Sequence, residues 1–248
     1  TSPNRLATVW VKFDAIVTSA TTFYMYYGNS GATAYSNGDN TFTFFDDFSG
    51  SAVNGNKWSQ YKQGSSTITV ESGLAKVKAI AGTSNGWVAC ILYTKAGISW
   101  ARPFAIRVKW KENDTPSSWA QLNPIAIYKD AANQIGFERY SNNYRYWRKI
   151  IGGTSTYVTS EMWGNDSAYH ISDFAFRAAD WSAWIDGIQK VNADSENTLT
   201  TGFTLRFQPQ EYYANQICEY WFDYVFVRNY VSSGSEPAWG SWGAEQTS

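Results

Sequence analysis

Apolar and polar residues alternate over many short stretches of this chain. Residues 104–110, for example, read FAIRVKW, in which apolar residues at every second position enclose basic ones. Such alternation is typical of a strand with one buried face. About a dozen short stretches of this kind succeed one another with Gly- and Asn-rich turn signals between them, and no segment keeps a 3.6-residue apolar period. The pattern predicts an all-β protein built as a two-sheet antiparallel β-sandwich.

The pattern also suggests how the chain is divided. Alternation over residues 8–17 and 21–29 ends at a Gly-Asn turn signal, and a polar, Gly-rich loop comes next. A unit of this size cannot hold a core alone. We therefore expect residues 1–40 to be a small β segment, part of a larger domain, that packs on the rest of the chain. Residues 41–231 would form the sandwich, and the Ser- and Gly-rich residues 232–248 a tail.

Composition narrows the classes of partner. The chain of 248 residues has 13 Trp, 17 Tyr and 14 Phe, and its formal net charge is −1. The charge provides no basic field for a nucleic acid or an anionic membrane, and no apolar run approaches the roughly 18 residues of a membrane span. Most of the rings should be core, but an exposed ring can stack on the C–H face of a sugar. We expect no nucleic-acid partner and no membrane insertion.

The cysteines and the N-terminus leave two questions open. Cys90 and Cys218 both lie inside apolar, strand-like runs. Two buried free thiols are the commoner case, and a disulfide between them is the alternative. The N-terminus lacks the pattern of a signal peptide and opens almost directly into an alternating stretch. We infer a processed form or a fragment of something longer.

Several motifs occur in a fixed order along residues 42–231: FFDDFSG, NKW, ESGLAKVK, AYHISDFAFRAADWSAWIDG and WFDYVFVRNY. Their order and approximate spacing resemble the glucanase branch of the concanavalin A-like superfamily, the scaffold of family 16 glycoside hydrolases. The resemblance implies a jelly roll. Residues 8–48 are also similar to the last part of a domain of unknown function, found beside such sandwiches in archaeal, bacterial and phage surface proteins. That second resemblance implies an extracellular, cell-surface or virion-surface setting.

The resemblance implies where catalytic residues would lie. Family 16 hydrolases carry a Glu-x-Asp-x-(x)-Glu strand whose carboxylates face a concave cleft. The matching strand here would direct Gln134, Gly136, Glu138 and Tyr140 to that cleft. Retention of configuration needs two carboxyl groups about 5–5.5 Å apart, and only Glu138 remains. The related alginate-lyase branch uses a His where this chain has Gly136, and the one histidine, His170, lies elsewhere. We therefore expect the chain not to be an enzyme.

The resemblance further implies a structural Ca²⁺ held by Asp223 and by backbone carbonyls of Asp47 and Gly73. Calcium prefers hard oxygen ligands, carbonyls included. Alternation places Asp223 on one strand face with Trp221 and Val225, and an unpaired carboxylate on an apolar face is costly. The alternative partner is a salt bridge, or hydrogen bonds to a nearby arginine or tryptophan.

Candidate ligand-binding residues are the rings and polar groups expected on or beside the concave sheet. They are Glu138, Tyr140, Tyr144, Tyr146, Trp119, Arg139 and Arg148. If the register slips by one, Trp147 replaces the tyrosines of its strand. The register decides which of them are core. We expect a non-catalytic, lectin-like carbohydrate-binding or adhesion module with a polysaccharide or glycan as partner. The alternatives are a self-associating structural or decoration subunit of a surface layer, filament or virion, which would contact neighbouring surface-protein domains, and then a polysaccharide-degrading enzyme.

Overall fold

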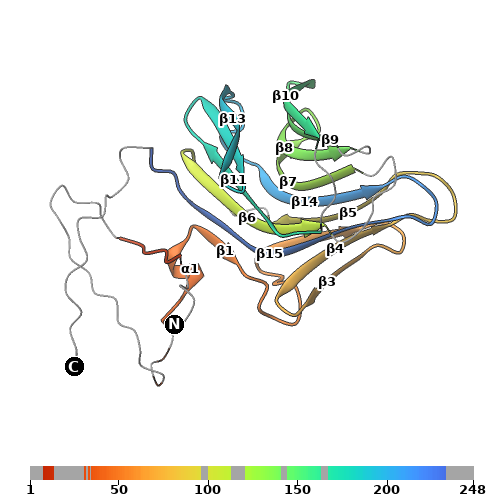
Figure 1. Cartoon of the computed structure of the whole chain (residues 1–248), viewed down its shortest axis with the longest axis horizontal. Helices are drawn as coiled ribbons and strands as arrows, with labels where there is room; N and C mark the ends of the chain where they lie inside the picture. Colours follow the sequence, from red (N-terminus) through yellow and green to blue (C-terminus); the bar gives the residue numbers. More distant parts are fainter. Residues whose placement is uncertain are drawn as a thin grey trace, which may run out of the picture.

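The chain folds into two antiparallel sheets that pack face to face (Figure 1). The computed structural model describes residues 8–13, 31, 33, 35–95, 100–112, 121–140, 144–162 and 167–232. Almost all of the secondary structure in these residues is strand, and this confirms the predicted all-β sandwich. No helix among them is long and apolar enough to cross a membrane.

The larger sheet has eight strands. They are β1 (Phe44–Asp46), β3 (Thr67–Glu71), β4 (Leu74–Ile80), β6 (Phe104–Glu112), β11 (His170–Phe176), β12 (Asp180–Ile185), β13 (Ile188–Ser195) and β15 (Ile217–Asn229). Their order is β13-β12-β11-β6-β15-β4-β3, and β1 also pairs with β15.

The smaller sheet has seven strands. They are β2 (Trp58–Lys62), β5 (Val88–Thr94), β7 (Gln121–Asp130), β8 (Asn133–Tyr140), β9 (Tyr144–Ile151), β10 (Thr154–Met162) and β14 (Thr204–Glu211). Their order is β10-β9-β8-β7-β14-β5-β2. Because neighbours in the sequence such as β4 and β5, or β14 and β15, lie in different sheets, the chain crosses between the two layers repeatedly.

The core lies between the sheets and consists of the inward residues of each alternating strand. In β14 the residues alternate strictly between partly and fully buried positions, as the sequence pattern predicts. Phe207 of β14 stacks on Phe222 of β15 with ring centroids 3.9 Å apart, which joins the two layers. Burying each such side chain contributes roughly 1.5–3 kcal/mol to folding. Cys90 and Cys218 are buried free thiols, and burial raises the pKa of Cys90 to about 11.

A β-bulge in β15 changes the face on which Asp223 lies. The pairing of β15 with β6 shifts between Phe222 and Tyr224. Phe222 and Val225 are therefore both buried, while Asp223 and Tyr224 between them are only partly buried. The predicted common face of Asp223 and Val225 is wrong, because the bulge adds one residue to the alternation.

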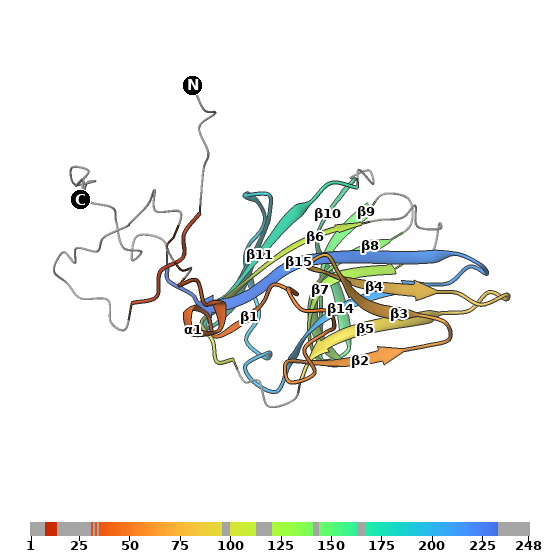
Figure 2. The ribbon, with the colours of Figure 1, turned by 90° about the horizontal axis from the view of Figure 1, so that it is seen from below.

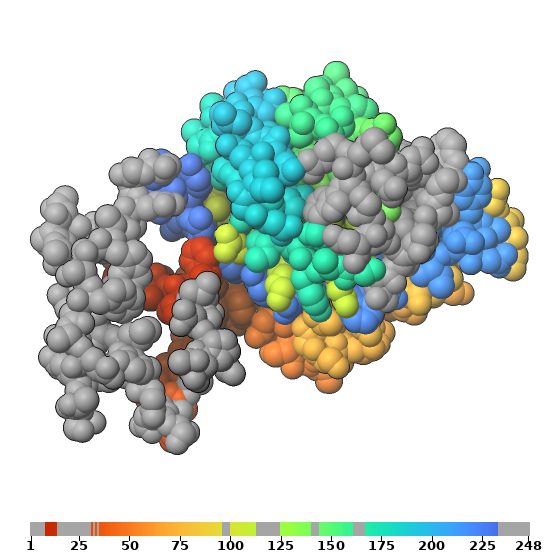
Figure 3. All heavy atoms as spheres, in the orientation of Figure 1, coloured from red at the N-terminus to blue at the C-terminus, as the bar shows by residue number. Residues whose placement is uncertain are grey.

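The described N-terminal residues pack against one end of the sandwich (Figures 2 and 3). Trp10 lies 5.1 Å from Phe226 of β15, ring centroid to ring centroid, and the guanidinium groups of Arg107 and Arg228 lie within 5.5 Å of the centroid of its ring. Up to residue 41, the described residues contain the short helix α1 (Gly38–Thr41) and no strand. The stretch 14–30, where a further strand is expected, and most of the expected tail lie outside the described residues.

Candidate functional site

The outer face of the seven-stranded sheet carries a set of tyrosines with a few charged groups. We call it the tyrosine face. Its members are Tyr93, Tyr128, Glu138, Tyr144, Tyr146, Arg148, Tyr157 and Arg206. They point outward because the residues that alternate with them, such as Leu92, Ile127 and Leu205, are fully buried in the core.

Strand register aligns part of the tyrosine face into one row across five strands. Tyr93 pairs with Arg206, Arg206 with Ala126, Ala126 with Gly136, and Gly136 with Arg148. The middle of the row therefore has the two smallest side chains. A Cβ added at Gly136 would lie 2.9 Å from a backbone carbonyl oxygen of β7, so the close approach of β7 and β8 requires glycine here.

Three tyrosines gather on β9 and β10, at one end of the face. Tyr144 and Tyr146 stack with ring centroids 6.0 Å apart, and Tyr146 lies 4.8 Å from Tyr157. Tyr144 is 39% exposed and Tyr157 is 53% exposed. An exposed ring presents a flat apolar surface with a polar hydroxyl at its edge. These rings can stack on a ligand that has both apolar and hydroxyl groups.

Glu138 and Arg148 form an ion pair beside these rings. Arg148 Nη1 donates to both carboxylate oxygens of Glu138 at 3.0 Å, and Arg148 Nε donates to Ser155 Oγ at 2.8 Å. Glu138 is only 7% exposed. Burial raises the pKa of Glu138, and the charge and hydrogen bonds of Arg148 offset only part of this effect. A carboxyl group with a raised pKa can serve as a proton donor at higher pH than an ordinary glutamic acid.

A second group of aromatic residues encloses an arginine toward the other end of the face. The guanidinium carbon of Arg206 lies 3.3 Å from the ring centroid of Tyr128 and 5.5 Å from that of Tyr93. Arg206 Nε donates a hydrogen bond to Thr204 Oγ1 at 3.3 Å. Stacking between rings holds the planar guanidinium in one orientation.

The structure brings only some of the predicted ligand-binding residues to this face. Glu138, Tyr144 and Tyr146 lie on it together, so the register is the one in which the tyrosines point outward. Trp147 is fully buried, 4.8 Å from Phe137, and cannot contact a ligand there. The prediction for Trp147 is wrong because it alternates with Tyr146. Trp119 and the side chain of Tyr140 lie outside what the structure describes.

Arg139 also points inward, so its predicted role as a ligand contact is wrong. It is 3% exposed and forms an ion pair with Glu112 of β6, which also forms an ion pair with Arg145, with Nη2 2.8 Å from Oε1. Arg139 comes directly after Glu138, so alternation sends it to the opposite side of the sheet. Arg139 and Arg145 of one sheet are thus joined to Glu112 of the other.

Sequence reasoning missed half of the tyrosine face. The missed residues are Tyr93, Tyr128, Tyr157 and Arg206. For the three on β5, β7 and β14 a signal exists, because each lies next to a buried aliphatic residue in an alternating run. No motif marked these strands, since the family's catalytic pattern falls on β8 alone.

His170 lies in the eight-stranded sheet, away from the tyrosine face. Its Nδ1 is 2.8 Å from Asp186 Oδ2, and its ring packs 5.3 Å from Trp110. Asp186 also accepts a hydrogen bond from the backbone N–H of Ile171. These contacts fasten the β12–β13 turn to β11.

The topology brings the three predicted calcium positions to one part of the eight-stranded sheet. β15 pairs with β6 along one edge, and with β4 and then β1 along the other. Gly73 immediately precedes β4 and Asp47 comes immediately after β1, so both flank the stretch of β15 that contains Asp223. The chain positions therefore converge as the resemblance implies.

The Asp223 side chain at that place forms an ion pair with a lysine. Asp223 Oδ2 is 2.6 Å from Lys109 Nζ of β6, and this hydrogen bond raises the pKa of Lys109. Asp47 Oδ1 accepts a hydrogen bond from the backbone N–H of Ser49 at 3.1 Å. Within the described residues, no three His, Cys, Asp or Glu side chains are placed to hold a metal ion. The salt-bridge alternative accounts for Asp223 with the groups present.

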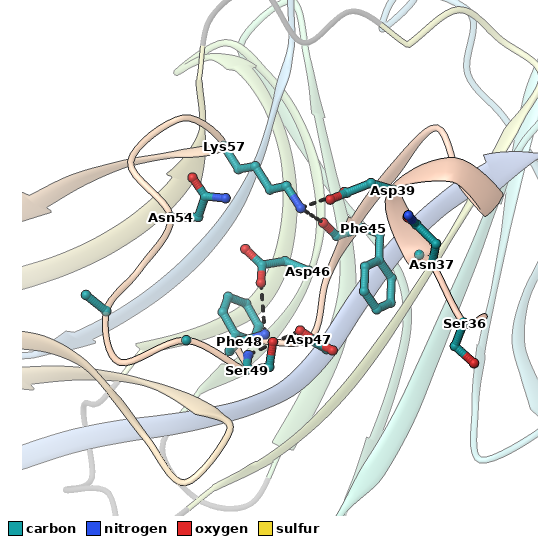
Figure 4. Close-up of a pocket in the computed structure, with 13 residues that line it drawn as sticks. Ser36, Asn37, Asp39, Phe45, Asp46, Asp47, Phe48, Ser49, Asn54 and Lys57 are labelled. Carbon is teal, nitrogen blue, oxygen red and sulfur yellow. Dashed lines mark hydrogen bonds and ion pairs between the residues drawn. The ribbon is translucent and has the colours of Figure 1, made fainter. Parts of the chain in front are cut away.

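A separate pocket of about 370 Å³ lies between α1 and the loop that joins β1 to β2 (Figure 4). Lys57 Nζ crosses it to Asp39 Oδ1 at 2.6 Å and to the Phe45 carbonyl oxygen at 2.7 Å. The Asp46 carboxylate accepts the Trp58 indole N–H at 2.7 Å. These groups satisfy one another, and they hold α1 and the loop against the sandwich.

Comparison with known proteins gives one sequence-family match. Residues 2–61 match a family described as Domain of unknown function (DUF2341). The match continues past residue 40 and through β1 into β2, so it includes the first strands of the sandwich. No curated protein matches the chain.

Solved structures match over three quarters of the chain. A catalytic domain of an endo-1,3-beta-glucanase (laminarinase) from Thermotoga petrophila RKU-1 matches with a TM-score of 0.60 and 12% identity, over 75% of this chain and 96% of that one. The endo-beta-1,3-glucanase from Pyrococcus furiosus matches with a TM-score of 0.62 and 11% identity, over 78% and 95%. A structure titled for endo-acting O-glycanases that initiate mucin breakdown, from human gut microbiota, matches with a TM-score of 0.61 and 13% identity, over 77% and 100%.

These matches show that the chain has the concanavalin A-like jelly-roll fold of glucanases. They also correct the expectation that the chain is not an enzyme, because the structures that share its fold are titled as glucanases and glycanases. That expectation rested on the missing carboxylates and the missing lyase histidine of one strand, and the pattern of a single strand is too narrow a basis for excluding catalysis. Identities of 11–13% establish the fold and not a particular reaction.

Proposed function

We propose that this chain is a carbohydrate-active domain that binds a polysaccharide chain across the tyrosine face. The observation that carries the proposal is the gathering of outward tyrosines over β5, β7, β9 and β10, with Arg148, Glu138 and Arg206 among them. Sugar rings present C–H faces that stack on aromatic rings, and hydroxyl groups that bind charged and polar side chains. A surface of several rings with a few oriented polar groups suits such a ligand.

The fold supports the same proposal. The laminarinase, glucanase and O-glycanase structures act, by their titles, on glucan or mucin glycans. Polysaccharides of this kind occur outside cells, and an extracellular or surface location of this chain is part of the proposal.

Glu138 is the residue from which an acid–base step on a bound chain would start. Its carboxyl group is buried, has a raised pKa and lies on the face that would hold the ligand. Retaining hydrolysis needs a second carboxyl group about 5–5.5 Å away, and Gly136 offers no side chain at the neighbouring outward position. Cleavage should therefore be measured together with binding, with Glu138→Gln as the deciding variant.

Affinity electrophoresis in gels that contain laminarin, polygalacturonate or mucin tests the proposal. Tyr144→Ala and Tyr157→Ala should weaken binding to the retained polysaccharide about tenfold each, as expected for an exposed aromatic anchor. Tyr169→Ala is the matched control, because Tyr169 is 41% exposed but lies beside lysines of the other sheet. Equal loss in all three variants, or no retardation of the wild-type chain in any gel, would contradict the proposal.

Release of reducing ends from the same polysaccharides is the companion measurement. Activity that disappears in Glu138→Gln while binding persists would identify a hydrolase that works through Glu138. Activity that persists in this variant would place the chemistry on another residue.

A further inference from the structure

Arg206 is held on the tyrosine face in an orientation that leaves its charge available to a ligand. Its neighbours Leu205 and Phe207 are buried in the core, so its side chain points outward. The rings of Tyr128 and Tyr93 enclose the guanidinium, and Nε bonds to Thr204 Oγ1. The Tyr128 side chain also forms a hydrogen bond with the guanidinium, and none of these contacts is with a carboxylate.

Arg206 differs in this respect from the other arginines of the same sheet. Arg148 pairs with Glu138, and Arg139 and Arg145 pair with Glu112. In the part of the chain that the structure describes, no carboxylate lies within ion-pair distance of Arg206.

A partly buried cation without a counter-ion is energetically unfavourable. Burial lowers the pKa of Arg206, and the neighbouring Tyr128 and Tyr93 oppose this effect. An arginine nevertheless keeps its proton at neutral pH. A ligand that supplies a negative group between the two rings would relieve this cost, and a guanidinium fork matches a carboxylate or a sulfate in shape.

We infer that the polysaccharide bound by the tyrosine face is acidic, and that Arg206 binds its carboxylate or sulfate group. The inference rests on the proposed function and names the class of ligand. Arg206 and Glu138 lie on the same face with β7 between their strands, which separates them by about 10 Å across the sheet. If the acidic group of one sugar is bound at Arg206, the next part of the polysaccharide would lie over Ala126 and Gly136, beside Glu138.

Two matched pairs of polymers test the inference with the full chain. One pair is polygalacturonate and its methyl ester, and the other is dextran sulfate and dextran. Binding is measured by calorimetry at physiological ionic strength, which screens non-specific attraction. The wild-type chain should bind the acidic member of at least one pair about tenfold more tightly than its neutral partner, the value of a hydrogen bond to a charged group. The pair that shows the preference distinguishes carboxylate from sulfate.

Variants assign the preference to Arg206. Arg206→Gln should abolish the preference for the acidic member of the pair. Lys111→Gln is the control, because it removes one positive charge from the outer face of the other sheet, where Lys111 lies over Trp221. This variant should retain the preference for the acidic polymer. Arg206→Lys keeps the charge without the planar fork and should reduce the preference. If Arg206→Gln fails to fold by circular dichroism, the reduction in Arg206→Lys decides.

The outcomes separate the two proposals. Neutral and acidic polymers bound equally by the wild-type chain would overturn this inference and leave the proposed function standing. The inference would also be overturned if the preference for the acidic polymer survived Arg206→Gln, or if Lys111→Gln weakened that preference as much as Arg206→Gln does. Binding of none of the four polymers would count against the proposed function itself.

Discussion

Glu138 is a carboxyl group whose surroundings act on it in opposite directions. Burial raises its pKa, while the Arg148 guanidinium lowers it, and burial is the larger effect. Glu196 has the opposite balance: burial alone would raise its pKa, but hydrogen bonds from Thr198 and Leu199 and the charge of Arg102 outweigh it and lower the pKa. One buried carboxyl is therefore tuned to hold a proton and the other to release it.

Glu138→Gln should change the pH dependence of stability in a defined direction. The folded state holds the Glu138 proton more tightly than the unfolded state does. Ionisation of Glu138 therefore lowers the free energy of unfolding as pH rises above about 4.3, the ordinary pKa of a glutamic acid. The free energy of unfolding of the wild type minus that of the variant should therefore fall between pH 4 and pH 7. Urea denaturation of both proteins at the two pH values measures it. A difference that grows with pH would show that Glu138 ionises more readily in the folded state.

Gly136→Ala should destabilise the sheet without adding any polar group. The new Cβ would lie 2.9 Å from a β7 carbonyl oxygen, so the strands must shift. The expected loss is about 1–3 kcal/mol in the free energy of unfolding, as for other overpacked sites. Gly55→Ala is the control, because a Cβ there meets nothing within 4 Å. Equal stability of the two variants by urea denaturation would show that β7 and β8 tolerate a side chain here.

At the scale of strands, alternation predicted much of the arrangement and failed where a strand departs from it. β8 and β9 alternate regularly, so Glu138, Tyr144 and Tyr146 could be assigned to one face from the sequence. The bulge in β15 adds a residue that no local pattern marks, so the surroundings of Asp223 could not be predicted. The partner of Arg139 in the other sheet could not be predicted either, because the contact between β8 and β6 arises only when the two sheets pack.

The ion pairs of Glu112 with Arg139 and Arg145 fasten the ends of β6, β8 and β9 across the core. Glu112→Gln removes a negative charge from between two buried arginines, and it should cost about 3–5 kcal/mol. The midpoint of urea denaturation measures this loss. Glu71→Gln is the control, because Glu71 forms an exposed pair with Lys76 and its loss should leave the midpoint nearly unchanged. Similar midpoints for both variants would mean that the buried pairs contribute no more than a surface pair.

The pairing of Asp223 with Lys109 leads to a prediction about metal ions. Because the carboxylate is already neutralised, neither millimolar calcium nor EDTA should change the melting temperature. A bound ion would stabilise the folded state by about 2.7 kcal/mol at a hundredfold excess over its Kd. A melting temperature that falls with EDTA and recovers with calcium would show that the ion displaces Lys109.

At the scale of the whole molecule, the two sheets present unlike outer faces. The seven-stranded sheet carries the tyrosine face, while the eight-stranded sheet carries lysines and the docked Trp10. The fold class could be predicted from the sequence because alternation and ordered motifs agree along most of the chain. The extent of the site could not, since it spans six strands whose order only the folded sheet defines.

Whether a polysaccharide lies on the tyrosine face can be read directly from a footprint of the tyrosines. Nitration of exposed tyrosines, combined with mass spectrometry of the peptides, reports each ring separately in the presence and absence of the polysaccharide best retained in the gels. We predict protection of Tyr144 and Tyr157, and unchanged nitration of Tyr169 on the other sheet. The proposed function would be contradicted if Tyr169 were protected while Tyr144 and Tyr157 remained fully nitrated, because the ligand would then lie on the opposite face of the sandwich.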